Sequence, residues 1–439
     1  MYQNITTSGG KYKFGFMGIH GNPWDDTFAF LQVSGANNSI EVSGFASTYF
    51  DFSGRSITGI TGDGNASLSD SGVHNSWTAG DGNDNTSVNT GAVYSTIKIG
   101  DGTDSVNDNG IFTTARIGDG DGNLWLGGTF GKITVGDGNN SITTNSNSFG
   151  YHVKVGDGNN TFDIDGFANN VTAGDGQVNG TINGFANDLT FGDGSYSLTI
   201  AGLDNVVTGG NGTGYVTMTG VGGTIETKGI ATVWGSQYGD YIVLGGNGDP
   251  NTGAASYVDS GAGNDWVSAG DLSRILLGAG NDTGTVGVGG TAKGGAGNDI
   301  LYGGKMSFLD GGAGNDRLEV NGNTLTGGAG ADTFFLSNKA SNGDFNYVTD
   351  FNVKQGDKLD LSGIHLDPKT DLGVNVSWGT LTLDWTSSGK PMEVQISGVG
   401  DAISHAGGFA GAMMAGIVTG IDAARVVSMP SPSFGGSKG

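Results

Sequence analysis

The residues of this chain best suited to chemistry are five aspartates that return at nearly constant spacing. The pentapeptide Gly-Ala-Gly-Asn-Asp begins at 261, 278, 295 and 312, and Gly-Ala-Gly-Ala-Asp begins at 328. Three copies complete a Gly-Gly-x-Gly-x-Asp hexapeptide, at 294–299, 311–316 and 327–332. Glycines permit a tight turn before each carboxylate, and hard cations take oxygen ligands. The spacing therefore predicts a stacked column of calcium sites.

A second acidic repeat precedes this block. Gly-Asp-Gly begins at 62, 80, 100, 118, 136, 156, 174 and 192, and a degenerate copy begins at 210. Midway between these turns lies glycine followed by an apolar residue, at 72, 110, 166, 184, 202 and 220. Apolar residues alternate around the acidic turns, as strands require. Each repeat thus predicts one coil with two strands and two unlike corners.

Composition favours a cation as the partner. The 439 residues include 88 glycines, 6 prolines and no cysteine, and 19 basic against 43 acidic residues give a net charge of −24. This balance argues against nucleic acid and against anionic lipid surfaces, both of which attract basic proteins. The lack of cysteine excludes disulfides and thiolate metal sites. The glycine content fits a solenoid because it follows the period of the repeats.

We expect the repeats to form a solenoid that is capped at both ends. We expect an N-terminal cap at 1–54, a Gly-Asp-Gly roll at 55–235, the second roll at 236–333, a C-terminal β cap at 334–400 and a tail at 401–439. Aromatic residues such as Trp24 and Phe28 support the N-terminal cap, with an interaction surface as the alternative. The N-terminus lacks a basic and apolar leader, so a Sec signal peptide is not expected. No membrane span is expected either, because no apolar run reaches the roughly 20 residues that a spanning helix needs.

The end of the second roll carries a family resemblance. From 327 the chain reads Gly-Gly-Ala-Gly-Ala-Asp-Thr-Phe-Phe-Leu, then Tyr-Val-Thr-Asp-Phe at 347–351 and Gly-Asp-Lys-Leu-Asp-Leu-Ser-Gly-Ile at 356–364. With the hexapeptides, this resembles the RTX family of calcium-binding repeat proteins exported by Gram-negative bacteria, and in particular the roll ends of serralysin-type proteases and alginate epimerases. The resemblance implies a right-handed parallel β-roll and export by a type I secretion machine that reads the C-terminus. The present tail departs from the family's usual acidic and then hydrophobic ending.

The resemblance also implies the ligands. In the family each ion lies between successive turns on one side of the roll, held by main-chain carbonyls of the glycine loop and by the aspartate. Multiple calcium ions are therefore expected here, and the residues carried over are Gly263, Asp265, Gly280, Asp282, Gly297, Asp299, Gly314, Asp316, Gly330 and Asp332. Ser260 and Leu277 replace the first glycine in two copies, which predicts weaker sites there.

The first roll offers a less regular set of carboxylates. Only Asp84 and Asp104 occupy the liganding position, which is Asn140 or Asn160 in two other copies. The acid of each copy lies instead in the turn itself, at Asp63, Asp81, Asp101, Asp119, Asp137, Asp157, Asp175 and Asp193. Because a stack of uncompensated carboxylates would be repulsive at coil spacing, these eight either bind calcium as well or point outward and accept hydrogen bonds from the turn.

Enzyme signatures are absent from the sequence. No metalloprotease, nucleophile-elbow or Walker motif occurs, and the five histidines are scattered. The chain is expected to be a secreted structural protein, found outside the cell or at its surface, that binds itself in a surface layer (S-layer), biofilm matrix or fibre. The alternative is a monomeric adhesin or carbohydrate-binding module for a surface polysaccharide, using the apolar corner with Phe149, Phe167, Phe185 and Leu203. We expect these four side chains to plug the corner instead. A polysaccharide lyase or epimerase is the least favoured class, and an ice-binding surface lacks a regular threonine ladder.

Overall fold

The computed structural model describes residues 2–5, 9–15, 28–43, 47–337, 343–364, 371–387, 390–422 and 425–428. The chain divides into two compact units, Met1–Glu226 and Thr227–Gly439. Both contain coils of a parallel β-solenoid, about 17 in all and about 18 residues long. The predicted all-β solenoid is therefore confirmed. In the described part of the chain, no helix is long and apolar enough to cross a membrane.

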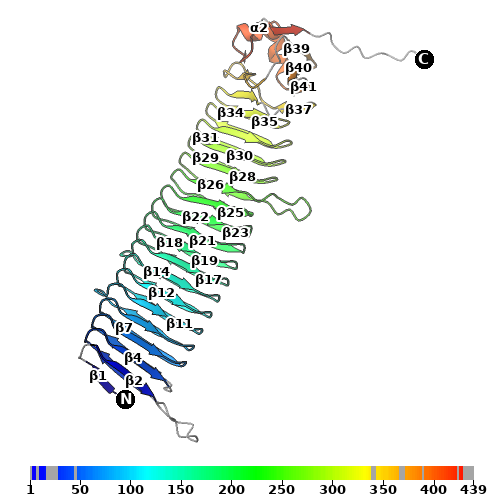
Figure 1. The fold of residues 1–439 in the computed structure, drawn as a ribbon. Helices are drawn as coiled ribbons and strands as arrows, with labels where there is room; N and C mark the ends of the chain where they lie inside the picture. The colour runs from blue at the N-terminus through cyan, green and yellow to red at the C-terminus, as the bar shows by residue number, and fades with distance from the viewer. Residues whose placement is uncertain are drawn as a thin grey trace. The chain divides into compact units, whose positions relative to one another are not determined.

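Each coil gives one strand to each of two parallel sheets, as the two-corner repeat predicts. In the first unit, β10 (Thr96–Lys98) pairs in parallel with β12 (Thr114–Ile117), while β11 (Asp104–Asp108) pairs with β13 (Gly122–Leu126). The same alternation continues along the unit, so odd-numbered strands form one sheet and even-numbered strands the other. Strands of successive coils lie side by side (Figure 1).

The strands of the first unit have the following bounds. The odd sheet contains β1 (Tyr2–Ile5), β3 (Phe28–Val33), β5 (Ser47–Phe52), β7 (Asn65–Asp70), β9 (Asn85–Val88), β11, β13, β15 (Ser141–Thr144), β17 (Asn160–Ile164), β19 (Val178–Ile182), β21 (Tyr196–Ile200) and β23 (Gly214–Met218). The even sheet contains β2 (Lys11–Gly15), β4 (Ser39–Ser43), β6 (Thr58–Thr61), β8 (Ser76–Thr78), β10, β12, β14 (Lys132–Val135), β16 (His152–Val155), β18 (Asn170–Thr172), β20 (Asp188–Thr190) and β22 (Val206–Gly209). Strand β24 (Thr224–Thr227) begins in the first unit, and its last residue belongs to the second.

The second unit continues the coil pattern before its last segment. Its odd strands are β25 (Ala231–Trp234), β27 (Tyr257–Asp259), β29 (Arg274–Ala279), β31 (Thr291–Ala296), β33 (Phe308–Ala313), β35 (Thr324–Ala329) and β37 (Asp344–Val348). Its even strands are β26 (Tyr241–Leu244), β28 (Trp266–Ala269), β30 (Thr283–Val286), β32 (Ile300–Gly303), β34 (Arg317–Val320), β36 (Thr333–Leu336) and β38 (Lys358–Asp360).

The narrow core consists of stacked apolar ladders. Ile133 of β14 lies beside Val153 of β16, and Ile142 of β15 lies beside Phe162 of β17. All four side chains are buried, whereas alternate residues on the same strands face outward. Burying each such side chain contributes about 1.5–3 kcal/mol. Because equivalent positions stack from coil to coil, one apolar residue per strand position is enough to continue the core.

The region expected as an N-terminal cap joins the same sheets. Strand β3 pairs in parallel with β1 and with β5, and β2 pairs with β4. The described part of 1–54 therefore has the coil architecture even though its sequence lacks the repeat. Its role as a cap stays a prediction, and Trp24 lies outside the described residues.

After β38 the second unit changes from coils to an antiparallel arrangement. Strand β40 (Thr380–Ser387) pairs antiparallel with β39 (Leu372–Ser377) and with β41 (Lys390–Ser397). Two short helices that the sequence did not predict follow, α1 (Gly400–His405) and α2 (Phe409–Met414), and then β42 (Val418–Thr419) and β43 (Val426–Ser428). The end of the predicted tail, 429–439, lies outside the described chain.

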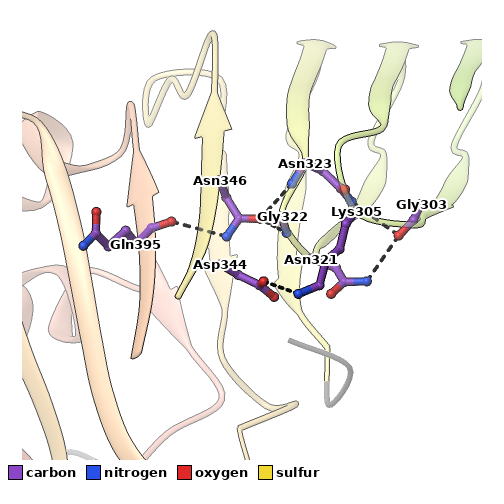
Figure 2. A network of polar contacts seen from close by, with 8 residues as sticks. All are labelled: Gly303, Lys305, Asn321, Gly322, Asn323, Asp344, Asn346 and Gln395. Carbon is purple, nitrogen blue, oxygen red and sulfur yellow. Dashed lines mark hydrogen bonds and ion pairs between the residues drawn. The ribbon is translucent and has the colours of Figure 1, made fainter. Parts of the chain in front are cut away.

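Strand β37 links the last coils to this C-terminal segment. It pairs with β35 on one side and with β41 on the other. The Asn346 Oδ1 atom accepts the N–H groups of Gly322 and Asn323, and its Nδ2 donates to the Gln395 carbonyl (3.3 Å). Figure 2 shows this side chain between the two segments, beside the 2.7 Å ion pair of Lys305 with Asp344. The side chain of Asn346 thus connects its own strand β37 with the backbone at 322–323 and with strand β41.

Candidate metal centre

The five repeated aspartates of the second unit form a continuous buried ladder. Each lies where a glycine loop ends and an even-numbered strand begins, as Asp282 does before β30. The N–H of Asp265 donates to Oδ1 of Asp282, and this contact repeats between Asp282 and Asp299, Asp299 and Asp316, and Asp316 and Asp332, at 2.8, 2.9, 2.8 and 2.9 Å. The structure therefore brings together all five carboxylates that the sequence singled out.

The second oxygen of each of these carboxylates has no partner. The five residues are at most 2% exposed, and Oδ2 of each makes no hydrogen bond. The four ion pairs in the described chain are Lys13–Glu41, Lys293–Asp310, Lys305–Asp344 and Arg317–Asp360, so no basic side chain compensates the ladder. A buried charge without a counter-charge is costly. The ladder therefore presents buried carboxylate oxygens whose charge no basic side chain of the described chain compensates.

Burial also perturbs the titration of the ladder. Desolvation raises the pKa of Asp282 and of Asp316 to about 7 and that of Asp265 to about 6, and neighbouring aspartates raise them further. The pKa values of Asp299 and Asp332 are raised by burial as well. Without a cation, raised pKa values favour the protonated, uncharged form of these carboxyl groups near neutral pH. A cation that compensates this charge would stabilise the fold directly.

The glycines predicted as carbonyl donors have the conformation that a close stack requires. Gly263, Gly280, Gly297, Gly314 and Gly330 all have positive φ, from 114° to 148°. A Cβ added to Gly297 would lie 1.7 Å from the carbonyl oxygen of Gly280 in the neighbouring coil. Only glycine permits this approach, which places one loop carbonyl directly against the next loop.

In two coils of the first unit, an asparagine occupies the position that aspartate has in the ladder. Asn160 Oδ1 accepts the N–H of Asn140 (3.2 Å), as an aspartate does in the ladder. Its Nδ2 donates to the carbonyls of Gly156 and Gly158, both at 3.3 Å, and Asn140 makes the equivalent contacts to its own loop. The asparagine amide thus satisfies two carbonyls of its own glycine loop. In an aspartate coil the equivalent carbonyls and the unpaired Oδ2 are both acceptors, which is the arrangement a cation needs.

Asp84 and Asp104 of the first unit share the signature of the ladder. Each is buried with Oδ2 unpaired, and Oδ1 of Asp104 accepts the N–H of Asp84 (3.0 Å). Burial raises the pKa of both to about 6. Among the less regular carboxylates of the first roll, these two therefore have the geometry of the second unit's sites.

The eight aspartates of the Gly-Asp-Gly turns in the first unit point outward. All are exposed, and Oδ1 of each accepts the N–H of the corner residue in the next coil, as Oδ1 of Asp101 does from Asp119 (2.8 Å). The remaining seven are Asp63, Asp81, Asp119, Asp137, Asp157, Asp175 and Asp193. We call this ladder the acidic corner. Its geometry is that of the second predicted alternative, an outward carboxylate that accepts a hydrogen bond from the turn.

Two members of the buried ladder, Asp240 and Asp357, were not predicted from the sequence. The N–H of Asp240 donates to Oδ1 of Asp265 (2.8 Å), and Oδ1 of Asp357 accepts the N–H of Asp332 (3.0 Å). Both are 3% exposed with a pKa raised by burial, and Asp240 keeps one oxygen unpaired. Each is separated from its neighbour in the ladder by more sequence than one regular repeat, so the constant period missed them. A glycine immediately before each aspartate was the available signal.

The apolar corner of the first unit differs from the expectation. Phe149, Phe167, Phe185 and Leu203 stack from coil to coil, but their side chains are 39–49% exposed rather than plugging the corner. Earlier in the chain, at the same corner, a stacked column is formed by His74, Tyr94, Phe112 and Phe130, with successive ring centroids 4.8, 5.1 and 5.3 Å apart. These four have positive φ, which turns the side chains outward at the corner. The prediction of a corner plug is therefore wrong.

Comparison with known proteins adds no family. No protein-family model matches this chain, and a search of curated proteins gives no match.

Among the described residues no three acidic, histidine or cysteine side chains converge on one point. A calcium ion at the ladder would therefore take one or two carboxylates and draw its other oxygens from glycine-loop carbonyls, which suits calcium's preference for several oxygen ligands.

Proposed function

We propose that this chain is a secreted, calcium-binding structural protein that folds outside the cell and assembles with copies of itself into a surface layer or matrix fibre. The observation that carries the proposal is the buried ladder of aspartates, each with one unpaired oxygen and no basic partner. Calcium supplies the positive charge that this ladder lacks. Asp265, Asp282, Asp299, Asp316 and Asp332 would hold it together with the glycine-loop carbonyls.

Export follows from the dependence on calcium. Where calcium is scarce, the buried carboxylates oppose the coil, so the chain stays unfolded and able to pass through a secretion channel. Where calcium is abundant, binding free energy becomes folding free energy. The family resemblance supports a type I secretion machine as the exporter, since its known substrates carry the same repeats.

The test is a calcium titration of the purified chain, followed by light scattering and electron microscopy. The proposal expects fibres or sheets at millimolar calcium that disperse when a chelator is added. A chain that binds calcium and folds but stays monomeric would contradict the assembly part of the proposal. Magnesium is the control, because its small size and strict octahedral geometry do not suit sites built from several carbonyls.

A second candidate function rests on the exposed aromatic corner. Tyr94, Phe112 and Phe130 are 41–48% exposed and stacked in one column, and such faces bind sugar rings in adhesins and carbohydrate-binding modules. A monomeric adhesin would use this column as its binding surface. Binding of a surface polysaccharide that is lost in Tyr94→Ser with Phe112→Ser, while the calcium-dependent fold is kept, would favour this candidate.

A further inference from the structure

Four of the seven Lys and Arg residues of the first unit lie on consecutive strands of one sheet. Residues 56–226 contain only four Lys or Arg residues, and these lie on four consecutive strands of the even sheet: Lys98 on β10, Arg116 on β12, Lys132 on β14 and Lys154 on β16. All four are exposed, and exposed His152 lies beside Lys132. We call these four residues the basic stripe. On a chain of net charge −24, this concentration of positive charge requires an explanation.

The stripe carries one basic residue per coil, in two adjacent outward rows. Lys98, Arg116 and Lys154 share one row, with Thr134 between Arg116 and Lys154, and Lys132 lies in the other row. The four strands contain no acidic residue. Lys98 pairs directly with Arg116, and Lys132 pairs with His152. The other outward residues of these strands are Thr96, Thr114 and Thr134, which are uncharged. None of the four basic residues takes part in an ion pair in the described chain. The stripe is therefore a positive surface with no partner in its own strands.

The acidic corner of the same coils has a matching repeat. Each coil that supplies one basic residue also supplies one exposed turn aspartate, at Asp101, Asp119, Asp137 and Asp157. Neighbouring strands lie about 4.8 Å apart, so the stripe and the corner each carry one charge per coil at about that interval, with Lys132 displaced by two residues along its strand. A second copy of this chain therefore carries a row of negative charge with the spacing of the basic stripe.

We propose that the basic stripe of one copy docks on the acidic corner of a second copy, side by side. The contact joins two different surfaces, so it is heterologous and leaves a free stripe and a free corner on the outer copies. Such contacts continue into an open lateral array rather than closing as a dimer. The inference rests on the proposed function, for which it supplies the surface that joins the copies.

The test compares two fourfold variants that lose the same charge. The first converts Lys98, Arg116, Lys132 and Lys154 to glutamine. The control converts Lys228, Arg274, Lys354 and Lys358 to glutamine, which are also exposed and outside every ion pair of the described chain. Circular dichroism in calcium first verifies that both variants fold. Light scattering then gives the critical concentration for assembly at low and high salt.

The stripe variant is expected to raise the critical concentration at least about tenfold, since four exposed charge pairs are lost together, while the control stays near wild type. Salt should weaken wild-type assembly and have little effect on the stripe variant. A second variant with Asp101, Asp119, Asp137 and Asp157 changed to asparagine keeps the Oδ1 acceptor and should reproduce the stripe variant's defect.

Three results would overturn the proposal in distinguishable ways. If the stripe variant assembles like wild type, the docking surface is wrong although the proposed function stands. If wild type folds in calcium but never assembles, the proposed function itself fails and the inference falls with it. If polygalacturonate binds wild type but not the stripe variant while both assemble equally, the stripe's partner is an acidic polysaccharide rather than a second copy.

Discussion

Aspartate and asparagine at the ladder position differ in how they contact their own glycine loop. Both residues accept the N–H of the preceding coil through Oδ1, as Asp316 and Asn160 show. Asparagine then donates its Nδ2 hydrogens to its own glycine loop, whereas aspartate presents a second bare oxygen to it. An asparagine coil is therefore complete by itself, whereas an aspartate coil keeps an unpaired buried oxygen, for which we propose a cation.

Replacing Asp299 separates these two roles. Asp299→Asn should keep the hydrogen bond from Asp282 and satisfy the loop, so the chain binds fewer calcium ions and needs less calcium to fold. Asp299→Ala removes the acceptor for a buried N–H and should destabilise the calcium-loaded chain by about 1–3 kcal/mol. Equilibrium dialysis and urea unfolding at saturating calcium measure the two effects. Unchanged calcium binding by the asparagine variant would contradict the assignment.

Lowering the pH should stabilise the calcium-free fold, because protons neutralise part of the buried carboxylate charge. An unfolded aspartate titrates near pH 3.9, whereas burial raises the pKa of Asp282 and Asp316 to about 7 in the folded chain. The calcium-free fold thus binds protons more tightly than the unfolded chain, and its stability rises as pH falls from about 7 to about 4. Circular dichroism in chelator should show more β structure at pH 5 than at pH 8.

The matched control for the acid effect is the double variant Asp282→Asn, Asp316→Asn. It lacks the two most perturbed carboxylates, so its calcium-free stability should depend less on pH in this range. A wild-type chain that loses β structure between pH 8 and pH 5 in chelator would show that burial does not oppose the charged ladder.

At the scale of the element, regular coils were predictable and interrupted coils were not. The constant periods of the two repeats predicted two strands per coil and placed Asp265 to Asp332 in one ladder. Asp240 and Asp357 were missed because a longer stretch of sequence separates each from its neighbour in the ladder, which hides the period. The corner side chains were misjudged because apolar residues normally face inward, whereas Phe149, Phe167, Phe185 and Leu203 are 39–49% exposed.

The link between the coils and the C-terminal strands depends on Asn346. Asn346→Ala leaves the N–H groups of Gly322 and Asn323 without their acceptor, which should cost about 2–4 kcal/mol for two hydrogen bonds. The expected result is a higher calcium midpoint for folding of the second unit. Phe345→Ala is the control, because Phe345 lies on the same strand and is 57% exposed. Equal midpoints for the two variants would exclude Asn346 as the link.

At the scale of the whole molecule, we expect charge to make folding depend on the calcium concentration. The net charge of −24 repels the compact state, and the buried ladder adds carboxylates that lack any basic partner. The spacing of the aspartates predicted cation sites, and this stays a prediction. The spacing could not show that the eight turn aspartates point outward while Asp84 and Asp104 are buried, because all ten lie in the same glycine-rich turns.

The most direct measurement is far-ultraviolet circular dichroism of the purified chain at pH 8 while calcium is added to a chelated sample. We expect a change from coil to β structure with calcium and a much smaller change with magnesium at the same concentration. We also expect reversal when chelator is restored. A chain that is fully β-folded in chelator at pH 8 would contradict the central claim that the buried aspartate ladder needs calcium.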